Sequence, residues 1–179
     1  MRFQTEVWER YADSQNRAKR ALRKATAKGT DMKLPVLNDI LDRNKLAYTV
    51  ELGIVEIPVS QIVGIGIDTD RDLYIRDFRP LSSVQSEFAE AWTEIYKQHL
   101  TDTGLVDPIR CCEYLGKFYV MDGKKRVSVL KAHGTMMVKA EVTRFLPEMS
   151  DDVQIQSYYE FLKTYEKTGL YQVAFTQPG

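Results

Sequence analysis

The chain has 179 residues, of which 44% are hydrophobic and 28% charged. This composition is typical of one folded domain with appendages, or of two small domains, and it excludes a disordered chain. The net charge is zero, so attraction to a charged partner has to come from a local cluster of charges. The sequence has no apolar run of membrane length and no signal-peptide core, and we expect a cytoplasmic protein without membrane contact.

The cysteines and histidines predict no metal site. Cys111 and Cys112 are adjacent in a strand-like run, so their side chains are expected on opposite faces of a sheet rather than in a disulfide. No Cys-x-x-Cys motif or His cluster accompanies them, and His99 and His133 are isolated in the sequence. We interpret all four as ordinary core or surface residues.

The first predicted helix covers residues 6 to about 28 and ends at Gly29. Its apolar positions are sparse, which predicts loose packing or packing against a partner. Its second half, "RAKRALRKATAK", is basic and contains no acid. Such a run is able to bind the phosphates of DNA, while the alternative is a solvated helical arm. The basic residues are Arg17, Lys19, Arg20, Arg23, Lys24 and Lys28.

Short elements are predicted next along the chain. Within residues 34–44, Pro35 suits the first position of a short helix. Residues 51–62 read as a strand that Pro58 stops, followed by a single turn. Residues 68–81 are dense in charge, and their pattern predicts no definite element.

A longer helix is predicted from Ser82 to about Leu100, with Ser82 and Gln85 as a capping box. Its apolar stripe is expected to face the core. Residues 107–121 then read as a β-hairpin with its turn at 115–117. The residues of the stripe are Phe88, Ala91, Trp92 and Ile95.

The stretch "VMDGKKRVSVLKAHG", residues 120–134, carries the strongest functional signal. A helix is predicted from about Lys124 to a C-cap at Gly134. Lys124, Lys125 and Arg126 occupy its first turn, although the N-terminal end of a helix is already the positive end of its dipole. This arrangement is favourable if an anion such as phosphate binds there.

The predicted anion site uses several further groups. Gly123 lets a ligand approach the backbone, Asp122 is expected as the N-cap, and Ser128 offers a hydroxyl. No Walker loop or G-x-G-x-x-G motif is present. The alternative is that the cations simply point into water. Three additional arginines are weaker candidates for contacts with the same anion, namely Arg76, Arg79 and Arg110.

After Gly134 the pattern predicts a half-buried strand in 136–146, followed by an amphipathic helix beyond Pro147. The final segment "YQVAFTQPG" is apolar and strand-like. Because no polar tail follows it, we expect a longer parent protein or a trimmed chain.

The order of these elements resembles the ParB/sulfiredoxin superfamily. The resemblance is carried by "GLVDPI" at 104–109, the hairpin, "DGKKR" opening a helix, and "KAHG" closing it. Upstream, "VEIPVSQI" at 55–62 is similar to the strand and turn that open such domains. The resemblance therefore covers about residues 55–145.

This resemblance implies a bacterial nucleotide-binding module. In ParB-type partition proteins the matching segment "GERR" binds the phosphates of cytidine triphosphate, and Gly123, Lys125 and Arg126 fit that pattern. The ligand implied here is a nucleoside triphosphate, CTP or ATP, with or without Mg²⁺. Lys124 replaces an acid of the partition proteins and the catalytic cysteine of sulfiredoxin, which argues against sulfiredoxin activity.

Together these observations predict an α+β fold, with a small mixed β-sheet, packed helices, and helical extensions at both ends. The expected divisions are a basic helical extension at 1–47, a ParB/sulfiredoxin-like domain at 48–147, and a C-terminal helix with a tail at 148–179. The chain is too short after Pro147 for the helix-turn-helix of DNA-binding ParB proteins. A regulatory or DNA-associated module, acting in partition or transcription and able to form a homodimer, is the first functional interpretation.

Two other interpretations stay open. "DGKKR" also resembles the "DGHHR" of free-serine kinases, which implies a small-molecule phosphotransferase. Such an enzyme needs an acidic base, and the sequence does not identify the catalytic residue. The third interpretation is a nucleic-acid or protein interaction domain without a small ligand. The candidate acids are Glu56, Asp68, Asp70 and Asp72.

Overall fold

The protein is described by a computed structural model in which residues 2–101 and 104–168 are placed. Within these residues the helices are α1 (Arg2–Ala27), α2 (Leu37–Ile40), α3 (Glu87–His99), α4 (Lys124–His133) and α5 (Val153–Thr168). The strands are β1 (Leu46–Pro58), β2 (Ile62–Ile65), β3 (Ile109–Tyr114), β4 (Lys117–Asp122) and β5 (Met137–Pro147). The strand-like tail expected at 171–179 lies outside the described residues.

The strands form one mixed sheet in the order β1-β5-β3-β4-β2. β1 pairs with β5, and β3 with β4, in antiparallel fashion, whereas β3–β5 and β2–β4 are parallel. The predicted α+β class with a small mixed sheet is therefore confirmed. Because β2 and β4 are parallel neighbours, the loop after β2 lies beside the residue at which α4 begins.

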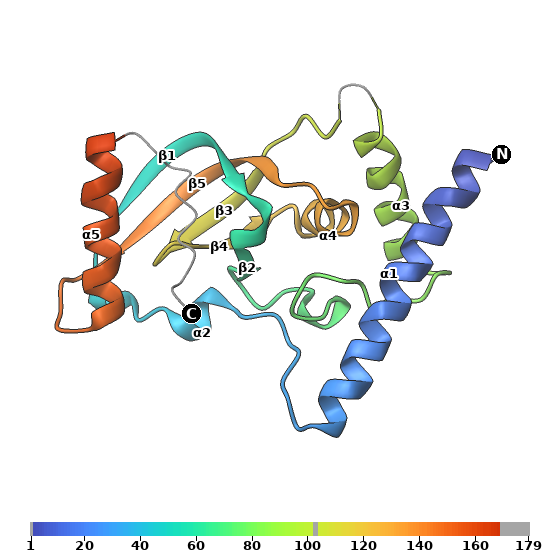
Figure 1. The fold of residues 1–179 in the computed structure, drawn as a ribbon, viewed down its shortest axis with the longest axis horizontal. Coiled ribbons are helices and arrows are strands. Elements are labelled where there is room, and N and C mark those ends of the chain that lie inside the picture. Colours follow the sequence, from blue (N-terminus) through green and yellow to red (C-terminus); the bar gives the residue numbers. More distant parts are fainter. Residues whose placement is uncertain (1, 102–103, 169–179) are drawn as a thin grey trace.

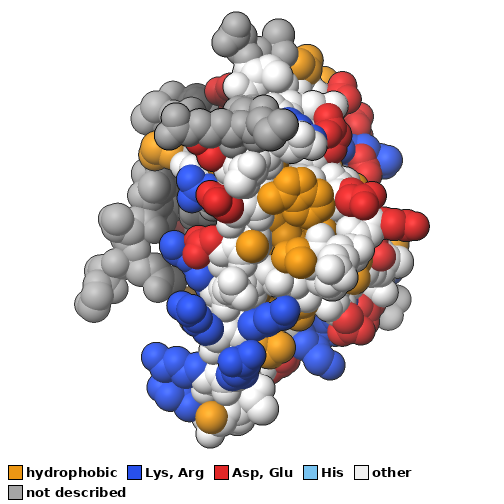
Figure 2. Space-filling view, turned by 90° about the vertical axis from the view of Figure 1, so that its right-hand side faces the viewer, with side chains coloured by type: hydrophobic (Ala, Val, Ile, Leu, Met, Phe, Trp, Pro, Cys, Tyr) orange, Lys and Arg blue, Asp and Glu red, His pale blue; other side chains and the backbone are white. Residues whose placement is uncertain are grey.

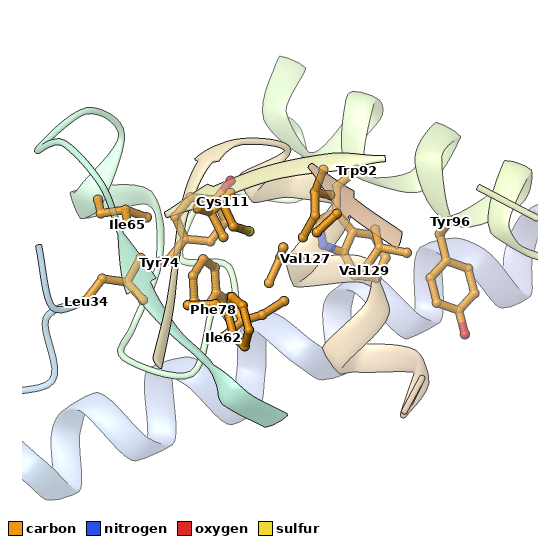
Figure 3. Packing of buried hydrophobic residues seen from close by; sticks show 14 of the residues in the cluster. Leu34, Ile62, Ile65, Tyr74, Phe78, Trp92, Tyr96, Cys111, Val127 and Val129 are labelled. Carbon is orange, nitrogen blue, oxygen red and sulfur yellow. The ribbon is translucent and has the colours of Figure 1, made fainter. Parts of the chain in front are cut away.

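The helices lie at the two ends of the sheet (Figure 1). α1 and α3 run side by side at one end with α4 between them and the sheet, while α5 lies at the other end. Figure 3 shows side chains from β2, the 74–78 segment, α3 and α4 pointing toward one another in the main core. The hydrophobic effect of this shared core holds α4 rigidly against the sheet.

The expectation that α1 packs loosely or against a partner is wrong. Val7, Tyr11 and Ala18 are buried, and the Tyr11 ring lies edge-on to Trp92 of α3 with 5.3 Å between centroids. The Tyr11 hydroxyl also donates to the Ser82 carbonyl at 2.9 Å. Few apolar residues suffice here because they are large and aligned on one face.

The expected capping box of α3 is also wrong. The helix begins at Glu87, and the N-cap is Ser86, whose hydroxyl accepts from the Ala89 amide at 3.2 Å. The Ser82 carbonyl instead accepts hydrogen bonds from α1, so tertiary contacts keep residues 82–85 out of the helix. Phe88, Trp92 and Ile95 of the predicted apolar stripe belong to the core, with Trp92 fully buried. Ala91 is half-buried and does not belong to the core cluster.

Residues 68–81, for which the sequence predicts no definite element, contribute heavily to the core. Tyr74, Ile75 and Phe78 are buried among the high density of charges. Phe78 adopts a left-handed φ of 67°, and its carbonyl accepts a 2.7 Å hydrogen bond from Ser128 of α4. This segment therefore connects the loop after β2 to the middle of α4.

The hairpin, the strand and both flanking helices after residue 107 agree with the prediction. The hairpin turn uses left-handed Leu115 and Gly116, as a tight right-twisted connection requires. Cys111 and Cys112 are free and pack into separate clusters on the two faces of the sheet, as expected. None of the described helices combines the length and the apolar character that a membrane crossing requires.

A buried polar cluster holds α5 to the sheet. The Glu113 carboxylate accepts from Arg144 Nε at 2.5 Å, from the Tyr158 hydroxyl at 2.8 Å and from the Gly116 amide at 2.7 Å. Glu113 is 1% exposed and Arg144 7%. Burying this charge is tolerable because each carboxylate oxygen receives at least one donor.

Candidate functional site

The first turn of α4 starts at a strained, crowded position. β4 ends at Asp122, and Gly123 turns the chain with a φ of +101°. A Cβ at residue 123 would lie 2.7 Å from the Cγ2 atom of Ile109. Both the backbone angle and the lack of space demand glycine there.

The expectation that Asp122 is the N-cap is wrong. Gly123 occupies the N-cap, and within residues 2–101 and 104–168 no side chain caps the amides of the first turn. Asp122 is the last residue of β4, and its Oδ2 accepts from Arg126 Nη2 at 3.0 Å. The helix therefore keeps its first amides uncapped by side chains, which is the arrangement that favours an anion.

The three cations of the first turn point in three directions. Lys124 Nζ donates to the Thr69 carbonyl at 2.6 Å and lies 3.2 Å from Asp70 Oδ2. Lys125 Nζ stands 5.4 Å above the centre of the Phe88 ring. Arg126 Nη1 donates to two carbonyl oxygens, of residues 107 and 108, at 2.9 and 3.0 Å. They are thus held within the fold, and the alternative that they simply point into water does not describe Lys124 and Arg126.

A cavity of about 700 Å³ opens beside Arg126. Its wall combines the end of α3, the loop that leads into β3, and the end of β4. Part of this wall is "GLVDPI", the segment that carried the resemblance. The lining residues are Ile95, Gln98, Thr101, Gly104, Leu105, Val106, Asp107, Pro108, Asp122 and Arg126.

Other predicted anion contacts lie elsewhere. Ser128 is buried, donates to the Phe78 carbonyl and accepts from Trp92 Nε1 at 2.9 Å. Arg79 pairs with Asp77 at 3.0 Å and lines a second cavity, while Arg110 lies 3.6 Å from Glu141 on the sheet. Arg76 is exposed. Among the described contacts, none joins these four side chains to the first turn of α4.

One candidate acid does reach α4. Asp70, in left-handed conformation at φ 59°, contacts Lys124 as described above. Asp68 instead lies 3.6 Å from Arg71, and Asp72 and Glu56 are exposed. Arg71 was not anticipated from the sequence. It donates to the Leu34 carbonyl at 2.9 Å and so fastens the loop that presents Asp70.

The basic half of α1 is solvent-exposed. Figure 2 looks onto the side of the molecule that α1 covers and shows Lys and Arg side chains gathered at its lower part. Each of the six predicted basic residues is exposed, and Arg17 also pairs with Asp13 at 2.9 Å. DNA contact and a homodimer stay predictions.

The described residues offer little for metal or thiol chemistry. No three His, Cys, Asp or Glu side chains in residues 2–101 and 104–168 lie close enough together to hold a metal ion. Burial raises the pKa of Cys111 to about 12 and that of Cys112 to about 11. At neutral pH both thiols therefore stay protonated and poorly nucleophilic.

Comparison with known proteins finds similarity among solved structures. No protein-family profile matches the chain, and no curated protein matches it. Among solved structures, the chain is similar to the C-terminally truncated chromosome-partitioning protein ParB from Caulobacter crescentus complexed with CTP-gamma-S. The match has 15% identity and a TM-score of 0.36, and covers 65% of this chain and 53% of the ParB chain. This protein thus spans about half the length of that ParB structure.

Proposed function

We propose that the cavity beside the first turn of α4 binds a nucleoside triphosphate and that the protein acts as a nucleotide-dependent regulatory or DNA-associated module. The observation that carries this proposal is that Arg126, in the first turn of α4, borders a cavity of about 700 Å³ that Asp122 also lines, although Gly123, Lys124 and Lys125 are not among its lining residues. Among the described contacts, no side chain caps the amides of this turn. Free amides, the helix dipole and a guanidinium all favour phosphate oxygens.

Arg126 is the central ligand-binding residue in this proposal. Its guanidinium is fixed by two backbone carbonyls, and its third partner is the carboxylate of Asp122, a side chain that is 65% exposed. An incoming phosphate can replace that carboxylate because the bond to Asp122 is close to solvent. The two carbonyl contacts preorganise the arginine and lower the cost of ordering it on binding.

The charges of the cavity favour a metal–nucleotide complex over a free triphosphate. The lining of the cavity contains one cation, Arg126, and two acidic residues, Asp107 and Asp122. A bare triphosphate would be repelled by these acids, whereas Mg²⁺ prefers carboxylate and phosphate oxygens together. The acids are therefore proposed to contact phosphate-bound Mg²⁺.

The remaining wall suits the nucleoside. Ile95, Leu105, Val106 and Pro108 give an apolar surface for a base or a ribose ring, and Gln98 adds an amide that donates and accepts. An amide of this kind can bind the polar edge of a base. CTP and ATP are the first nucleotides to compare.

Thermal unfolding with each nucleoside triphosphate, with and without Mg²⁺, tests this proposal. A ligand at 100 times its Kd should stabilise the protein by about 2.7 kcal/mol. Arg126→Ala should remove that stabilisation, and Arg110→Ala should keep it because Arg110 is an exposed arginine outside the cavity. If no triphosphate changes the melting temperature, or if both variants lose the effect equally, the proposal is wrong.

A phosphotransferase is the second candidate function, and Asp70 is the observation that favours it. Of the four candidate acids it is the one with a described contact to the first turn of α4. In this case nucleotide turnover should rise with a small hydroxyl substrate and should be lost in Asp70→Asn, while Asp72→Asn stays active. A panel of amino acids and sugars that gives only background turnover would count against an enzyme.

A further inference from the structure

A second charged cavity lies between α1 and α4, away from Arg126. It measures about 270 Å³, and we call it the α1–α4 groove. Four cations line it, against two carboxylates, which leaves an excess of two positive charges in the lining. The cations are Arg10, Arg17, Arg79 and Lys131, and the acids are Asp13 and Asp77.

The two carboxylates of the groove are already paired. Asp13 lies 2.9 Å from Arg17, and Asp77 lies 3.0 Å from Arg79. Neither Arg10 nor Lys131 forms a salt bridge with a carboxylate among the described residues, although the charge of Asp77 acts on Lys131. Lys131 is half-buried, with Nζ 5.6 Å from the centre of the Phe78 ring. The groove therefore presents two cations to whatever enters it, and one of them has its stem packed into the protein.

The groove continues into the basic half of α1. Arg10, Arg17 and Lys24 follow one another at intervals of seven residues, which places them on one line along the helix, about 10 Å apart. No acid occurs between Asp13 and Asp31. Four further cations of this half are exposed beside that line, and they are Lys19, Arg20, Arg23 and Lys28. Figure 2 shows the resulting concentration of positive charge at one end of a protein whose net charge is zero.

We propose that the α1–α4 groove and the basic half of α1 form one surface for the sugar-phosphate backbone of duplex nucleic acid. The groove receives one phosphate between Arg10 and Lys131, and the following turns of α1 contact the neighbouring phosphates. A straight row of cations matches the regular charge of a duplex. Contacts of this kind fix position without reading base sequence.

A membrane surface is a poorer partner for α1. A helix that lies on a bilayer inserts an apolar face between the lipids. The apolar face of α1, which includes Val7, Tyr11 and Ala18, is buried inside the protein. Its outward face therefore offers charge with little apolar surface, which favours a hydrated polyanion.

Fluorescence anisotropy of a short labelled duplex, titrated at several KCl concentrations, tests the proposal. The affinity should fall linearly on a log–log plot, with a slope of about −0.9 for each phosphate contact. The triple variant Arg20→Ala/Arg23→Ala/Lys24→Ala should weaken binding at least tenfold and reduce the slope by about two to three. Arg10→Ala alone should reduce the slope by about one.

The control is a second triple variant, Lys45→Ala/Lys139→Ala/Lys163→Ala, which removes the same charge from exposed positions elsewhere. It should bind the duplex like the parent protein. Equal loss in both triple variants would mean that net charge alone governs binding, and would overturn the proposal. Tighter binding to anionic phosphatidylserine vesicles than to duplex, or no binding to duplex at low salt, would overturn it as well.

The duplex surface is separate from the proposed nucleotide site. Arg126→Ala changes the other cavity, and none of its described contacts belongs to the groove. This variant should therefore keep the salt dependence of duplex binding. A loss of duplex binding in Arg126→Ala, with its melting temperature unchanged, would contradict a surface confined to α1 and the groove.

Discussion

Charged side chains are held in opposite ways at the two ends of the sheet. At the end covered by α5, Glu113 and Arg144 are buried and joined at 2.5 Å, with Tyr158 on the same carboxylate. At the other end, Lys124 and Arg126 pair with Asp70 and Asp122, whose side chains are more than half exposed.

The buried pair of Glu113 and Arg144 stabilises the fold, whereas the pairs of Lys124 and Arg126 are accessible to an external anion. The partners of Glu113 cannot be exchanged for a ligand without opening the core, so this cluster contributes to the cohesion of the sheet and α5. The carboxylate partners of Lys124 and Arg126 lie at the surface, and an external anion can compete with them while the backbone carbonyl contacts stay in place. The following predictions test the difference, beginning with the largest effect on stability.

Glu113→Ala should be the most damaging change. It removes the Glu113 carboxylate from the buried Arg144 side chain, and breaking a buried pair in this way costs about 3–5 kcal/mol. Urea denaturation would measure the loss. Glu141→Ala is the matched control, because Glu141 is exposed and 3.6 Å from Arg110, and it should cost less than about 1 kcal/mol. Equal losses would mean that burial does not distinguish the two pairs.

Gly123→Ala should rank second, at about 1–3 kcal/mol. The alanine would have to adopt a φ near +101° and would press its Cβ against Ile109. Gly134→Ala, at the other end of α4, has a φ of +82° with open space around the Cβ, so it carries the backbone strain without the clash. Thermal unfolding should show a smaller loss for Gly134→Ala. A larger loss for Gly134→Ala than for Gly123→Ala would mean that crowding by Ile109 does not explain the glycine at position 123.

Arg126→Ala should lower stability by only about 1 kcal/mol, since the carbonyls and Asp122 that it leaves are close to water. Its main effect should be on the ligand, as described for the nucleotide experiment. A loss as large as that of Glu113→Ala would show that Arg126 is a structural residue. The comparison between the two ends of the sheet would then fail.

The smallest expected effect concerns pH. His99 and His133 join α3 to α4 with their rings 4.6 Å apart, and the buried Nδ1 of His99 has no hydrogen-bond partner in the described structure. Burial, and then His133, lower the pKa of His99 below 6.5. The unfolded chain therefore takes up a proton at His99 more readily than the folded protein does. The contribution of neutral His99 to the free energy of unfolding is complete above about pH 6.5 and is lost as the pH falls further.

Melting temperatures measured from neutral to mildly acidic pH would show this loss. His99→Gln should reduce the slope of the curve, because it removes the titrating group and keeps a side chain able to bond to Thr135. Glu148→Gln serves as the control, since Glu148 is an exposed side chain away from α3 and α4. An unchanged slope in His99→Gln would assign the pH dependence to other groups.

Much of the fold could be predicted because its signals are local. The "DGKKR" helix start, the Leu115-Gly116 turn and the alternation in β5 depend on residues next to one another in the chain. The cap of α3 was wrong for the opposite reason. Ser82 is held by α1, which is a tertiary contact. Asp122 instead ends β4, and its carboxylate pairs with Arg126 four residues later.

The site was predicted only in part. Lys124, Lys125 and Arg126 were found as a group, but their divergence depends on Thr69, on Phe88 and on the carbonyls of residues 107 and 108. Ser128 was expected to offer its hydroxyl to the anion, yet that hydroxyl connects Phe78 to Trp92. The direction of a long side chain depends on packing between segments that are distant in the sequence. Sequence periodicity therefore does not predict that direction.

The pairing of β1 with β5 has a consequence for how the chain folds. Leu46 lies opposite Pro147, and Pro58 opposite Met137, so the first and last strands of the sheet must meet across nearly the whole intervening chain. Pairings so distant in sequence close late, and domains dominated by them fold in milliseconds to seconds rather than microseconds. During synthesis, the strand at 46–58 cannot pair with β5 until residue 147 has left the ribosome. Until then its backbone hydrogen-bonding groups are unpaired and able to bind incorrect partners.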